Sequence, residues 1–389
     1  MKGKLKMSYD IHVSISEAEL VYCKFLSAND VGLTGGHQSG PYVAKSAVSI
    51  LFDKPCSKGT NITKTVEIKW HDDSKTISNF KYYGTGTRNE YRITSFGRGF
   101  PHFRTSNIGS LFILCKMDLE TYRGYVIEEE TEIDAFLDYY GLSPAETNAL
   151  LTVNDSISVE TQVQQFLDQI TGDFPSSAEI ALKARSVFET MPQRGNLADS
   201  DMMLINWLKH EYLLFKEIEK KFNQDILEVK FQSIDAFINR ANSVLNRRKS
   251  RAGKSLENHL AEIFRRNALR FVDQGITEQN KRPDFLFPDE GTYWDAVSTF
   301  DYENLAMLAS KTTCKDRWRQ ILTEADKIEV KHLFTLQQGI SANQLNEMKN
   351  QKVQLVVPKQ YISTYPMAYR DWIWDLSKFI SFIKEKQND

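Results

Sequence analysis

Asp284 and Lys311 are the residues of this chain whose types and surroundings first suggest chemistry. Asp284 stands in RPDFLF, at the start of a short apolar run, and Lys311 comes just after a second apolar run. Hydrolysis of a phosphodiester with Mg²⁺ needs hard oxygen ligands for the ion. It also needs a cation near the attacking water or the phosphate. A carboxylate and an ammonium group on neighbouring strands supply both, so this pair indicates a phosphodiesterase site.

The spacing is that of the PD-(D/E)xK nuclease motif, with one departure. The second acid of that motif normally stands two residues before the lysine, where this chain has Ala309. If a helix begins near Lys315, Glu324 lies about two turns into it and its long side chain can swing back to the ion. An N-capping Asp284 and a solvated Lys311 explain the same residues without chemistry, and both interpretations stay open on the motif alone. The acids that follow the lysine closely are Asp316, Glu324 and Asp326.

The second half of the chain has the pattern of an α/β domain, which would carry these residues on its strands. Apolar runs predict strands at Asp284–Phe287, Leu305–Ala309, His332–Leu336 and Val353–Val357. Apolar residues at spacings of three and four predict helices at Ala178–Glu189, Asp199–Phe222, Ser233–Leu245, Lys254–Arg270, Arg317–Ile328 and Tyr369–Glu385.

The first ~135 residues are β-rich, and short strands with frequent turns favour a barrel or a sandwich. The strands are expected at Tyr42–Phe52, Lys64–Trp70, Glu90–Ile93 and Ser110–Met117. From Glu132 the segments AFLDYYG, SPAETNALL and VETQVQQFLDQI have a helical pattern. Thr171–Ser177 contains Gly, Pro and Ser, which predicts a domain boundary and two domains, residues 1–172 and 173–389.

The composition is that of a globular protein, with 389 residues, 41% hydrophobic and 26% charged. Neither a secretory signal nor a membrane-spanning run is visible, and the four scattered cysteines indicate reduced thiols rather than a disulfide framework or a zinc ribbon. The net charge of −2 hides a strong asymmetry. Residues 1–104 carry +6, residues 105–172 carry −10 and residues 173–389 carry +2. Local anion-binding patches are therefore plausible, although solvated faces would give the same charges.

A basic run occupies the middle of the second half. Its five cations could neutralise phosphates on either side of a cut, or could simply face solvent at a helix start. GKS at Gly253–Ser255 resembles part of a P-loop, but Arg248 stands where that loop needs its earlier glycine, so no ATP use is expected. The run consists of Arg247, Arg248, Lys249, Arg251 and Lys254.

Five segments closely resemble the EcoRII family of type IIE restriction endonucleases, in the same order and at similar separations. They are SANDVGLTGGHQSGPY, TRNEYRITSFGRG, NRRKSRAGKSLE, NKRPDFLFP and KTTCKDRWRQILTEADKI. The resemblance implies a Mg²⁺-dependent homodimer with two domains. An N-terminal pseudobarrel, similar to the plant B-three-type DNA-binding domain, binds one copy of the site as effector. A C-terminal restriction-endonuclease-like domain of the PD-(D/E)xK class cuts another copy, at CCWGG and before its first C.

The resemblance also assigns the catalytic residues. In this family the second acid of the nuclease motif lies on a helix, which accounts for the alanine at position 309. Asp284 and Glu324 would be ligands of Mg²⁺, and Lys311 would orient water or stabilise the phosphate. Glu257 is an additional outer acid. Tyr293 matches a tyrosine once considered a nucleophile, and we expect it to act structurally near the site, because a metal-activated water needs no covalent intermediate.

Base recognition is implied for the segment CKDRW. Lys315 and Arg317 have donors for guanine, and Asp316 can accept from cytosine; without the resemblance, an exposed helix start would explain Lys315 and Asp316 equally well. Tyr212 matches an aromatic residue that holds a flipped central base in relatives. Leu208 stands where those relatives have an arginine, which leaves open whether Lys209 or Trp207 substitutes or the pocket is built differently, and an ordinary core role for Tyr212 stays open.

The effector domain would contact DNA through two arms, and singly the same residues would be turn formers and surface ion pairs. Its acidic continuation, residues 105–172, is expected to pack near the catalytic groove and compete with DNA, which would give autoinhibition. The candidate effector residues are His37, Gln38 and Tyr42 on the first arm, Arg88, Asn89, Glu90 and Arg92 on the second, and Lys24 and Asn29 as weaker additions.

The sequence therefore predicts a type IIE restriction endonuclease that engages two or more site copies on double-stranded DNA. The resemblance further implies a bacterial cytosolic location and a cognate cytosine DNA methyltransferase that protects host DNA. A non-cleaving DNA-binding regulator with an inactive nuclease lobe is the main alternative, and a structure-specific repair nuclease is a third. The complete set Asp284, Lys311 and Glu324 argues against the regulator.

Overall fold

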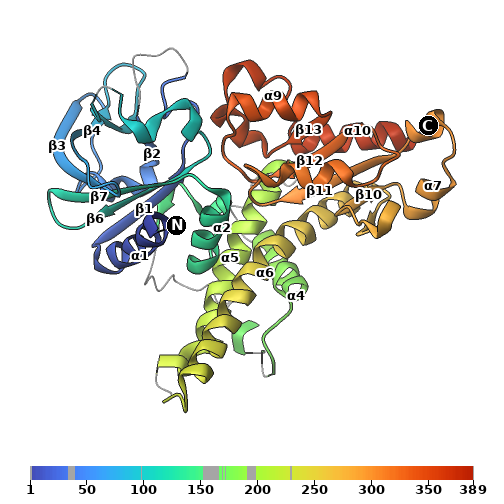
Figure 1. Cartoon of the computed structure of the whole chain (residues 1–389), viewed down its shortest axis with the longest axis horizontal. Helices are drawn as coiled ribbons and strands as arrows, with labels where there is room; N and C mark the ends of the chain where they lie inside the picture. Colours follow the sequence, from blue (N-terminus) through green and yellow to red (C-terminus); the bar gives the residue numbers. More distant parts are fainter. Residues whose placement is uncertain are drawn as a thin grey trace.

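The computed structural model describes residues 2–33, 40–97, 99–151, 166–168, 170, 172–190, 199–227 and 230–388. Figure 1 shows a β-rich N-terminal lobe and an α/β C-terminal lobe side by side, with the long helices α5 (Ser200–Asn223) and α6 (Ile234–Arg266) running below and between them. Among the described residues, no helix is both long and apolar enough to cross a membrane.

The N-terminal lobe is built on an eight-stranded sheet in the order β2-β5-β4-β3-β7-β6-β1-β8. Neighbouring strands are antiparallel except for β3 and β7. The predicted β-rich first half is confirmed, whereas closure into a pseudobarrel stays a prediction. The strands are β1 (Leu20–Phe25), β2 (Tyr42–Val43), β3 (Asn61–Trp70), β4 (Lys75–Tyr83), β5 (Glu90–Thr94), β6 (Leu111–Lys116), β7 (Thr121–Ile127) and β8 (Ala149–Leu150).

Two segments of this half differ from their predicted structure. The strand expected at Tyr42–Phe52 is only β2, followed by a 3₁₀-helix at Lys45–Ile50 that buries its apolar side chains against the sheet. The helix expected in SPAETNALL is a single 3₁₀ turn, Pro144–Glu146, followed by β8. Glu146 accepts hydrogen bonds from the Ser143 amide and hydroxyl, a capping box that stabilises the start of the turn. Most of VETQVQQFLDQI lies outside the described residues.

Two helices flank the N-terminal sheet, α1 (Lys2–Glu17) and α2 (Glu130–Tyr140). Helix α2 begins with Glu130 and Glu132 in its first turn, where carboxylates favour the helix dipole. It ends at Gly141, whose φ of 66° is a left-handed conformation that glycine adopts without strain. Helix α2 contacts α6, so the acidic stretch of the sequence lies between the two lobes.

The C-terminal lobe has a five-stranded sheet in the order β13-β12-β11-β10-β9. Its strands β10 to β13 confirm the four predicted ones to within two residues at each end. Strands β10 and β11 are antiparallel, with Phe285 opposite Leu308, and β11, β12 and β13 are parallel. The strands are β9 (Val272–Asp273), β10 (Phe285–Phe287), β11 (Ala306–Lys311), β12 (Lys331–Thr335) and β13 (Val353–Val356).

The helices of this lobe correct three predictions. The two helices expected at Ser233–Leu245 and Lys254–Arg270 are one continuous helix, α6, because the polar stretch between them packs beside α2 and α5 and contains no proline. Arg317–Ile328 contains a 3₁₀-helix, Arg317–Thr323, and the last helix starts at Leu376 rather than Tyr369. The α-helices are α4 (Ser177–Thr190), α5, α6, α7 (Glu290–Asp295), α8 (Thr299–Tyr302), α9 (Ala342–Asn350) and α10 (Leu376–Asn388).

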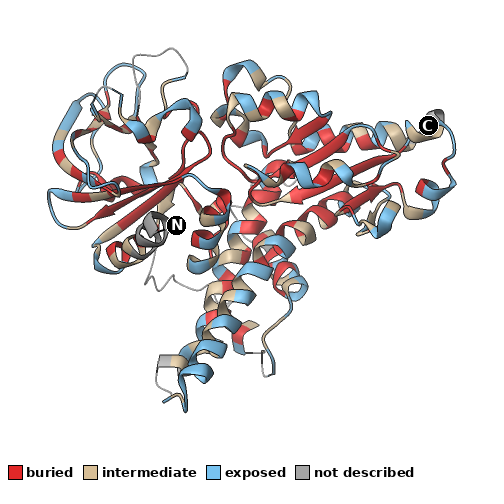
Figure 2. Ribbon diagram, in the orientation of Figure 1, coloured by how far each residue is buried: buried red, intermediate tan, exposed pale blue. Residues whose placement is uncertain are grey.

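The two lobes meet along a backbone seam. The Ala28 amide donates to the Thr364 carbonyl at 3.0 Å. A Cβ at Gly109 would lie 2.4 Å from the Gly339 carbonyl oxygen, so only glycine fits at that approach. Figure 2 shows that the C-terminal sheet and the strands β1, β6 and β7 are largely buried, whereas β3 and β4 also carry exposed residues. The seam therefore fixes the N-terminal lobe against the side of the C-terminal sheet.

Candidate active site

Asp284 directly precedes β10, at the edge of the C-terminal sheet where β11 also ends. Its Oδ2 accepts hydrogen bonds from the Ser310 amide at 2.7 Å and the Ser310 hydroxyl at 3.2 Å. Its Oδ1 accepts a bond from Gln274 Nε2 at 2.9 Å. Because β10 and β11 are neighbours in the sheet, this carboxylate is held by backbone register as well as by side chains.

Lys311 is the last residue of β11, and its Nζ lies 3.8 Å from Asp284 Oδ2. The side chain of Lys311 keeps 28% of its surface exposed and that of Asp284 keeps 13%. The pair is thus accessible to a substrate from solvent. The expected approach of Asp284 and Lys311 on neighbouring strands is present in the structure.

Glu324 completes the site from a position that differs from the predicted one. We expected it two turns into an α-helix, but it is the residue that follows the 3₁₀-helix Arg317–Thr323, and its backbone is extended. Trp318 and Ile321 are fully buried at a spacing of three residues. That spacing puts two apolar side chains on one face of a 3₁₀-helix, which explains the tighter turn. Three further residues along, the chain reaches Glu324.

The carboxylate of Glu324 lacks a hydrogen-bond partner that a buried carboxylate needs. Burial raises the pKa of Glu324 to about 7; nearby Lys311 opposes this rise and Asp284 adds to it. Its Oε2 is buried and has no hydrogen-bond partner. A buried carboxylate oxygen without a donor is costly unless a cation or water meets it. Asp284 and Glu324 therefore fit a hard divalent cation such as Mg²⁺.

A cavity of about 350 Å³ opens beside Asp284. Lys254, Glu257 and Gln274 line it together with Asp284. Glu257 Oε2 lies 2.7 Å from Lys254 Nζ, one turn earlier on α6. Glu257 thus shares the cavity of Asp284, as an outer acid should. Among the described residues, however, no group of three or more His, Cys, Asp and Glu side chains is arranged to hold a metal ion.

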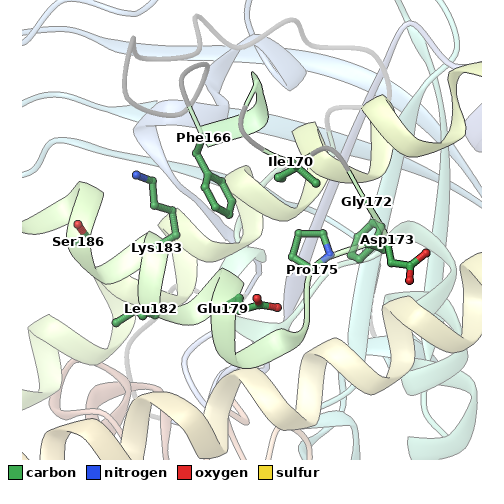
Figure 3. Close-up of a pocket in the computed structure, with 10 residues that line it drawn as sticks. Phe166, Ile170, Gly172, Asp173, Pro175, Glu179, Leu182, Lys183 and Ser186 are labelled. Atoms are coloured by element: carbon green, nitrogen blue, oxygen red, sulfur yellow. The ribbon is translucent and has the colours of Figure 1, made fainter.

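A second cavity, of about 690 Å³, lies beside α4 and shares no lining residue with the cavity beside Asp284 (Figure 3). Phe166, Ile170 and Pro175 give it an apolar wall. Glu179 lines it too, but its carboxylate caps α4 by accepting bonds from the Ser176 amide and hydroxyl. Lys183 also lines it, but its Nζ lies over the ring of Phe166, at 5.3 Å.

Tyr293 is fully buried and does not face Asp284. Its hydroxyl donates to Glu278 Oε2 at 2.5 Å and accepts a bond from the Lys327 amide at 3.3 Å. Burial, followed by the Glu278 hydrogen bond, raises the pKa of the Tyr293 hydroxyl. A buried phenol with a raised pKa is a poor nucleophile, so the geometry supports a structural role.

The segment predicted to read bases, CKDRW, contacts the N-terminal lobe. Arg317 Nε lies 3.1 Å from Glu130 Oε1, and its Nη2 lies 2.5 Å from Asp134 Oδ2. Lys315 Nζ donates to the Glu128 carbonyl and to Ser110 Oγ, and the Asp316 amide donates to Glu130. The donors expected to read bases are therefore bonded to α2 and its neighbours.

Residues of the basic run are also engaged, in the middle of α6 rather than at a helix start. Arg248 forms two hydrogen bonds with Glu219, at 2.8 and 2.6 Å. Arg251 is buried, donates to the Gly141 carbonyl at 3.2 Å and lies 5.5 Å from the ring of Tyr212. Arg247 lies 4.0 Å from the ring of Phe174. Gly253–Ser255 lies inside this helix and not in a phosphate-binding loop.

Tyr212 lies on α5 and packs against the core of the N-terminal lobe. Burial raises the pKa of its hydroxyl. Leu208, one turn earlier, is buried in the core of the C-terminal lobe. Tyr212 is thus covered by the other lobe, and Leu208 offers no polar group to a base at this position.

The candidate effector arms meet at the pairing of β2 with β5, where Tyr42 is opposite Arg92. Arg92 bonds to the Gly40 carbonyl at 3.2 Å and lies 3.4 Å from Glu90. Asn89 Oδ1 accepts a hydrogen bond from Tyr82, and Arg88 lies over the ring of Tyr83 at 5.6 Å. His37 and Gln38 lie outside the described residues.

Lys24 and Asn29 make contacts that support the structure of the first arm. Lys24 Nζ forms a buried ion pair with Asp30 at 2.7 Å and donates to the Tyr42 carbonyl at 3.0 Å. Asp30 also accepts bonds from the Ser27 and Tyr42 amides, which fixes the start of the first arm. The Asn29 carbonyl accepts a bond from the Gly32 amide in the same turn.

Sequence reasoning missed several residues around Asp284 and Glu324. Gln274, Thr277, Glu278 and Lys281 all contact Asp284 or the backbone next to Glu324. They lie in an irregular loop between β9 and β10, where no periodic pattern marks them. Their closeness to the proline and aspartate of RPDFLF was the only signal available.

A strand-borne aspartate, a lysine at the end of the next strand and a buried unpartnered glutamate define a nuclease of the restriction-endonuclease class. The EcoRII C-terminal family model matches residues 215–380, and the EcoRII N-terminal model matches residues 15–137. The chain is 39% identical to the type II restriction enzyme EcoRII of Escherichia coli over 394 residues, covering 94% of each protein. The chain belongs to the EcoRII family, and the expected family is confirmed.

Two solved structures of restriction endonucleases are also similar, at a lower level. A complex of PspGI with substrate DNA has a TM-score of 0.46 at 15% identity, covering 57% of this chain and 97% of PspGI. A metal-depleted complex of Ecl18kI with uncleaved, modified DNA has a TM-score of 0.45 at 18% identity, covering 58% and 83%.

Proposed function

We propose that this protein is a type IIE restriction endonuclease that cuts double-stranded DNA at a CCWGG-like site. The single observation that carries the proposal is the approach of Lys311 Nζ to Asp284 Oδ2, at 3.8 Å, beside the unpartnered carboxylate oxygen of Glu324. Membership of the EcoRII family supports the substrate class. The division into an effector domain, residues 1–172, and a catalytic domain, residues 173–389, is part of the same proposal.

Each catalytic residue has a role that follows from its position. Asp284 and Glu324 would hold Mg²⁺ through their carboxylate oxygens. When bound, the ion supplies Lewis-acid activation of water and neutralises charge on the phosphate. Lys311 extends from the same sheet edge and would place its ammonium group against the scissile phosphate, where negative charge develops. Glu257 would accept a hydrogen bond from water in the adjoining cavity.

The contacts of the recognition segment support the predicted autoinhibition. Arg317 uses Nε for Glu130 and Nη2 for Asp134 and Thr313, which takes most of its donors away from a guanine edge. Tyr212 and Arg251 are likewise covered by, or bonded to, the N-terminal half. We infer that specific DNA must displace α2 from this segment, and that a site copy bound by the effector arms favours the displaced state.

A digest of DNA of known sequence with Mg²⁺ tests the proposal. We expect discrete bands whose mapped ends lie before the first C of CCWGG, and faster cutting when the DNA carries two or more sites. Shifted but intact DNA would support a regulator instead, and smears or junction-dependent nicks would support a repair nuclease. The homodimer, the cytosolic location and the cognate cytosine methyltransferase also belong to the proposal, and the twofold symmetry of the target favours the homodimer.

A further inference from the structure

Glu324 differs from the other two catalytic candidates in how the chain holds it. Asp284 and Lys311 adjoin β10 and β11, whose hydrogen-bonded register fixes their separation. Glu324 follows a 3₁₀-helix, and the next residue, Ala325, has a φ of 49°. No sheet ladder therefore sets the distance of Glu324 from Asp284. Contacts of another kind must do so.

The loop between β9 and β10 supplies these contacts on both sides of Glu324. Lys281 Nζ donates to the Thr323 carbonyl at 2.7 Å, just before Glu324. Thr277 Oγ1 accepts a bond from the Ala325 amide at 3.4 Å, and Glu278 Oε2 accepts one from the Asp326 amide at 3.0 Å, just after it. Three side chains of one short loop thus bracket a single carboxylate.

The same loop also bonds to Asp284, the other proposed ligand of the divalent ion. Gln274, at its start, donates from Nε2 to Asp284 Oδ1 at 2.9 Å and from its amide to the Asp284 carbonyl at 3.2 Å. Asp284 itself ends the loop. One continuous segment, residues 274–284, therefore carries Asp284 and contacts the backbone on both sides of Glu324, although the two acids are 40 positions apart in the chain.

The loop has a fixed shape that suits this use. The Thr277 amide donates to the Lys281 carbonyl at 2.8 Å, and Thr277 is 1% exposed. Gln274, Gln279 and Asn280 all have φ near 55–60°, a left-handed conformation that costs energy in residues other than glycine. Such conformations persist where surrounding contacts determine them. Here Tyr293, which is buried, anchors Glu278 through its hydroxyl.

We propose that residues 274–281 form a brace that sets the position of Glu324 relative to Asp284, with Thr277, Glu278 and Lys281 as positioning residues for the divalent ion. In the usual motif the second acid lies on the strand, two residues before the lysine, and the sheet register sets its position. In this chain that position is Ala309, and the brace sets the position of Glu324 instead. This inference rests on the proposed function, because it takes Asp284 and Glu324 as metal ligands.

Two variants with matched controls test the brace. Thr277→Val removes the acceptor of the Ala325 amide and a donor to the Lys281 carbonyl, and Ser233→Ala removes a hydroxyl that accepts the Ala236 amide at the remote start of α6. Lys281→Met removes a bond from a lysine to a carbonyl, and Lys64→Met removes such a bond in the N-terminal lobe. Binding of Mn²⁺ is measured directly by electron paramagnetic resonance, alongside thermal unfolding and the Mg²⁺ dependence of cleavage.

We expect both brace variants to weaken Mn²⁺ binding about 10- to 100-fold, as loss of outer partners of metal ligands typically does. The Mg²⁺ concentration for half-maximal cleavage should rise in parallel, while binding of specific DNA without metal and the unfolding temperature stay at the values of the controls. Brace variants that bind Mn²⁺ like their controls would overturn the inference alone. A wild-type protein that neither binds the ion nor cuts DNA would overturn the proposed function, and the inference with it.

Discussion

The guanidinium group of Arg317 lies 2.5 Å from the carboxylate of Asp134, although the two residues belong to opposite halves of the chain. Glu130, one turn earlier on α2 and almost fully buried, takes a second nitrogen of the same group at 3.1 Å. The acidic stretch of the sequence is therefore bonded to the segment that we propose to read bases. On that proposal, its negative charge competes with a guanine edge or a phosphate for Arg317.

Removal of these acids should activate the enzyme. The double variant Glu130→Ala, Asp134→Ala frees Arg317 and lowers the free energy needed to displace α2. We expect cleavage of a duplex with one site to accelerate about 5- to 150-fold, the range of a coupling energy of about 1–3 kcal/mol. The measurement is the single-turnover rate on one-site DNA with saturating Mg²⁺.

The control for this activation is Glu347→Ala. Glu347 pairs with Arg319, only two residues from Arg317, at 2.6 Å and on the exposed side of the segment. This variant should leave the one-site rate unchanged. If the double variant cuts one-site DNA no faster than Glu347→Ala, α2 does not restrain the catalytic domain.

Arg317→Ala should reduce discrimination between sites. A bidentate contact to guanine contributes about 1–3 kcal/mol, so specific binding should weaken by that amount while binding to unrelated DNA stays the same. Gel-shift titration at fixed salt, without divalent metal, measures the ratio of the two affinities. Arg319→Ala is the matched control, and an unchanged ratio in Arg317→Ala would remove Arg317 from base recognition.

The variant Tyr293→Phe distinguishes a nucleophilic role of the Tyr293 hydroxyl from a structural one. The variant loses only the hydroxyl that donates to Glu278, so the brace loosens and cleavage should slow without disappearing. Tyr365→Phe is a suitable control, because Tyr365 is also fully buried and donates to the Gln337 carbonyl at 2.6 Å. A folded Tyr293→Phe protein with no detectable cleavage in Mg²⁺ would instead favour a covalent role for the hydroxyl.

The raised pKa of Glu324 predicts a change of stability with pH. The pKa rises from the usual 4.5 to about 7 on folding, so the folded protein binds more protons than the unfolded chain between these values. Stability from this group is therefore fully present below pH 4.5 and is lost as the pH rises through 7. Glu324→Gln removes the cost of the charge, and should be about 1–3 kcal/mol more stable than wild type at pH 8 without metal.

Denaturant unfolding at several pH values measures this difference. The gain from Glu324→Gln should shrink steadily between pH 8 and pH 5, because the wild-type carboxyl becomes protonated. Glu257→Gln is the control, since Glu257 already has Lys254 at 2.7 Å and should show no such gain. An equal stability of Glu324→Gln and wild type at pH 8 would mean that Glu324 is solvated rather than held in the site.

The strands of the active site could be predicted because their residues carry a local signal. Runs such as Phe285–Phe287 and Val353–Val356 are apolar and bounded by turn residues, and the structure has strands there. The pairing of Asp284 with Lys311 followed from this, since both adjoin such runs. Spacing made Glu324 one of three candidate acids after Lys311, and only the family resemblance singles it out from Asp316 and Asp326.

Other features could not be predicted because they depend on distant contacts. The polar middle of α6 reads as an interruption, yet it is helical because α2 and α5 pack beside it. The segment after Asp316 forms a 3₁₀-helix because Trp318 and Ile321 both face the core. The charges of residues 105–172 predicted a negatively charged surface, but they did not predict that this surface pairs with Arg317. The brace has no periodicity at all.

The central claim is that Asp284, Lys311 and Glu324 form one catalytic site for metal-dependent cleavage of specific DNA. The most direct measurement compares wild type with Lys311→Ala on a duplex with two CCWGG sites, scoring both specific binding without metal and cleavage with Mg²⁺. We predict wild-type affinity for the specific site and a cleavage rate lower by at least about 100-fold, because the cation opposite the phosphate is lost. Wild-type cleavage by Lys311→Ala would contradict the account.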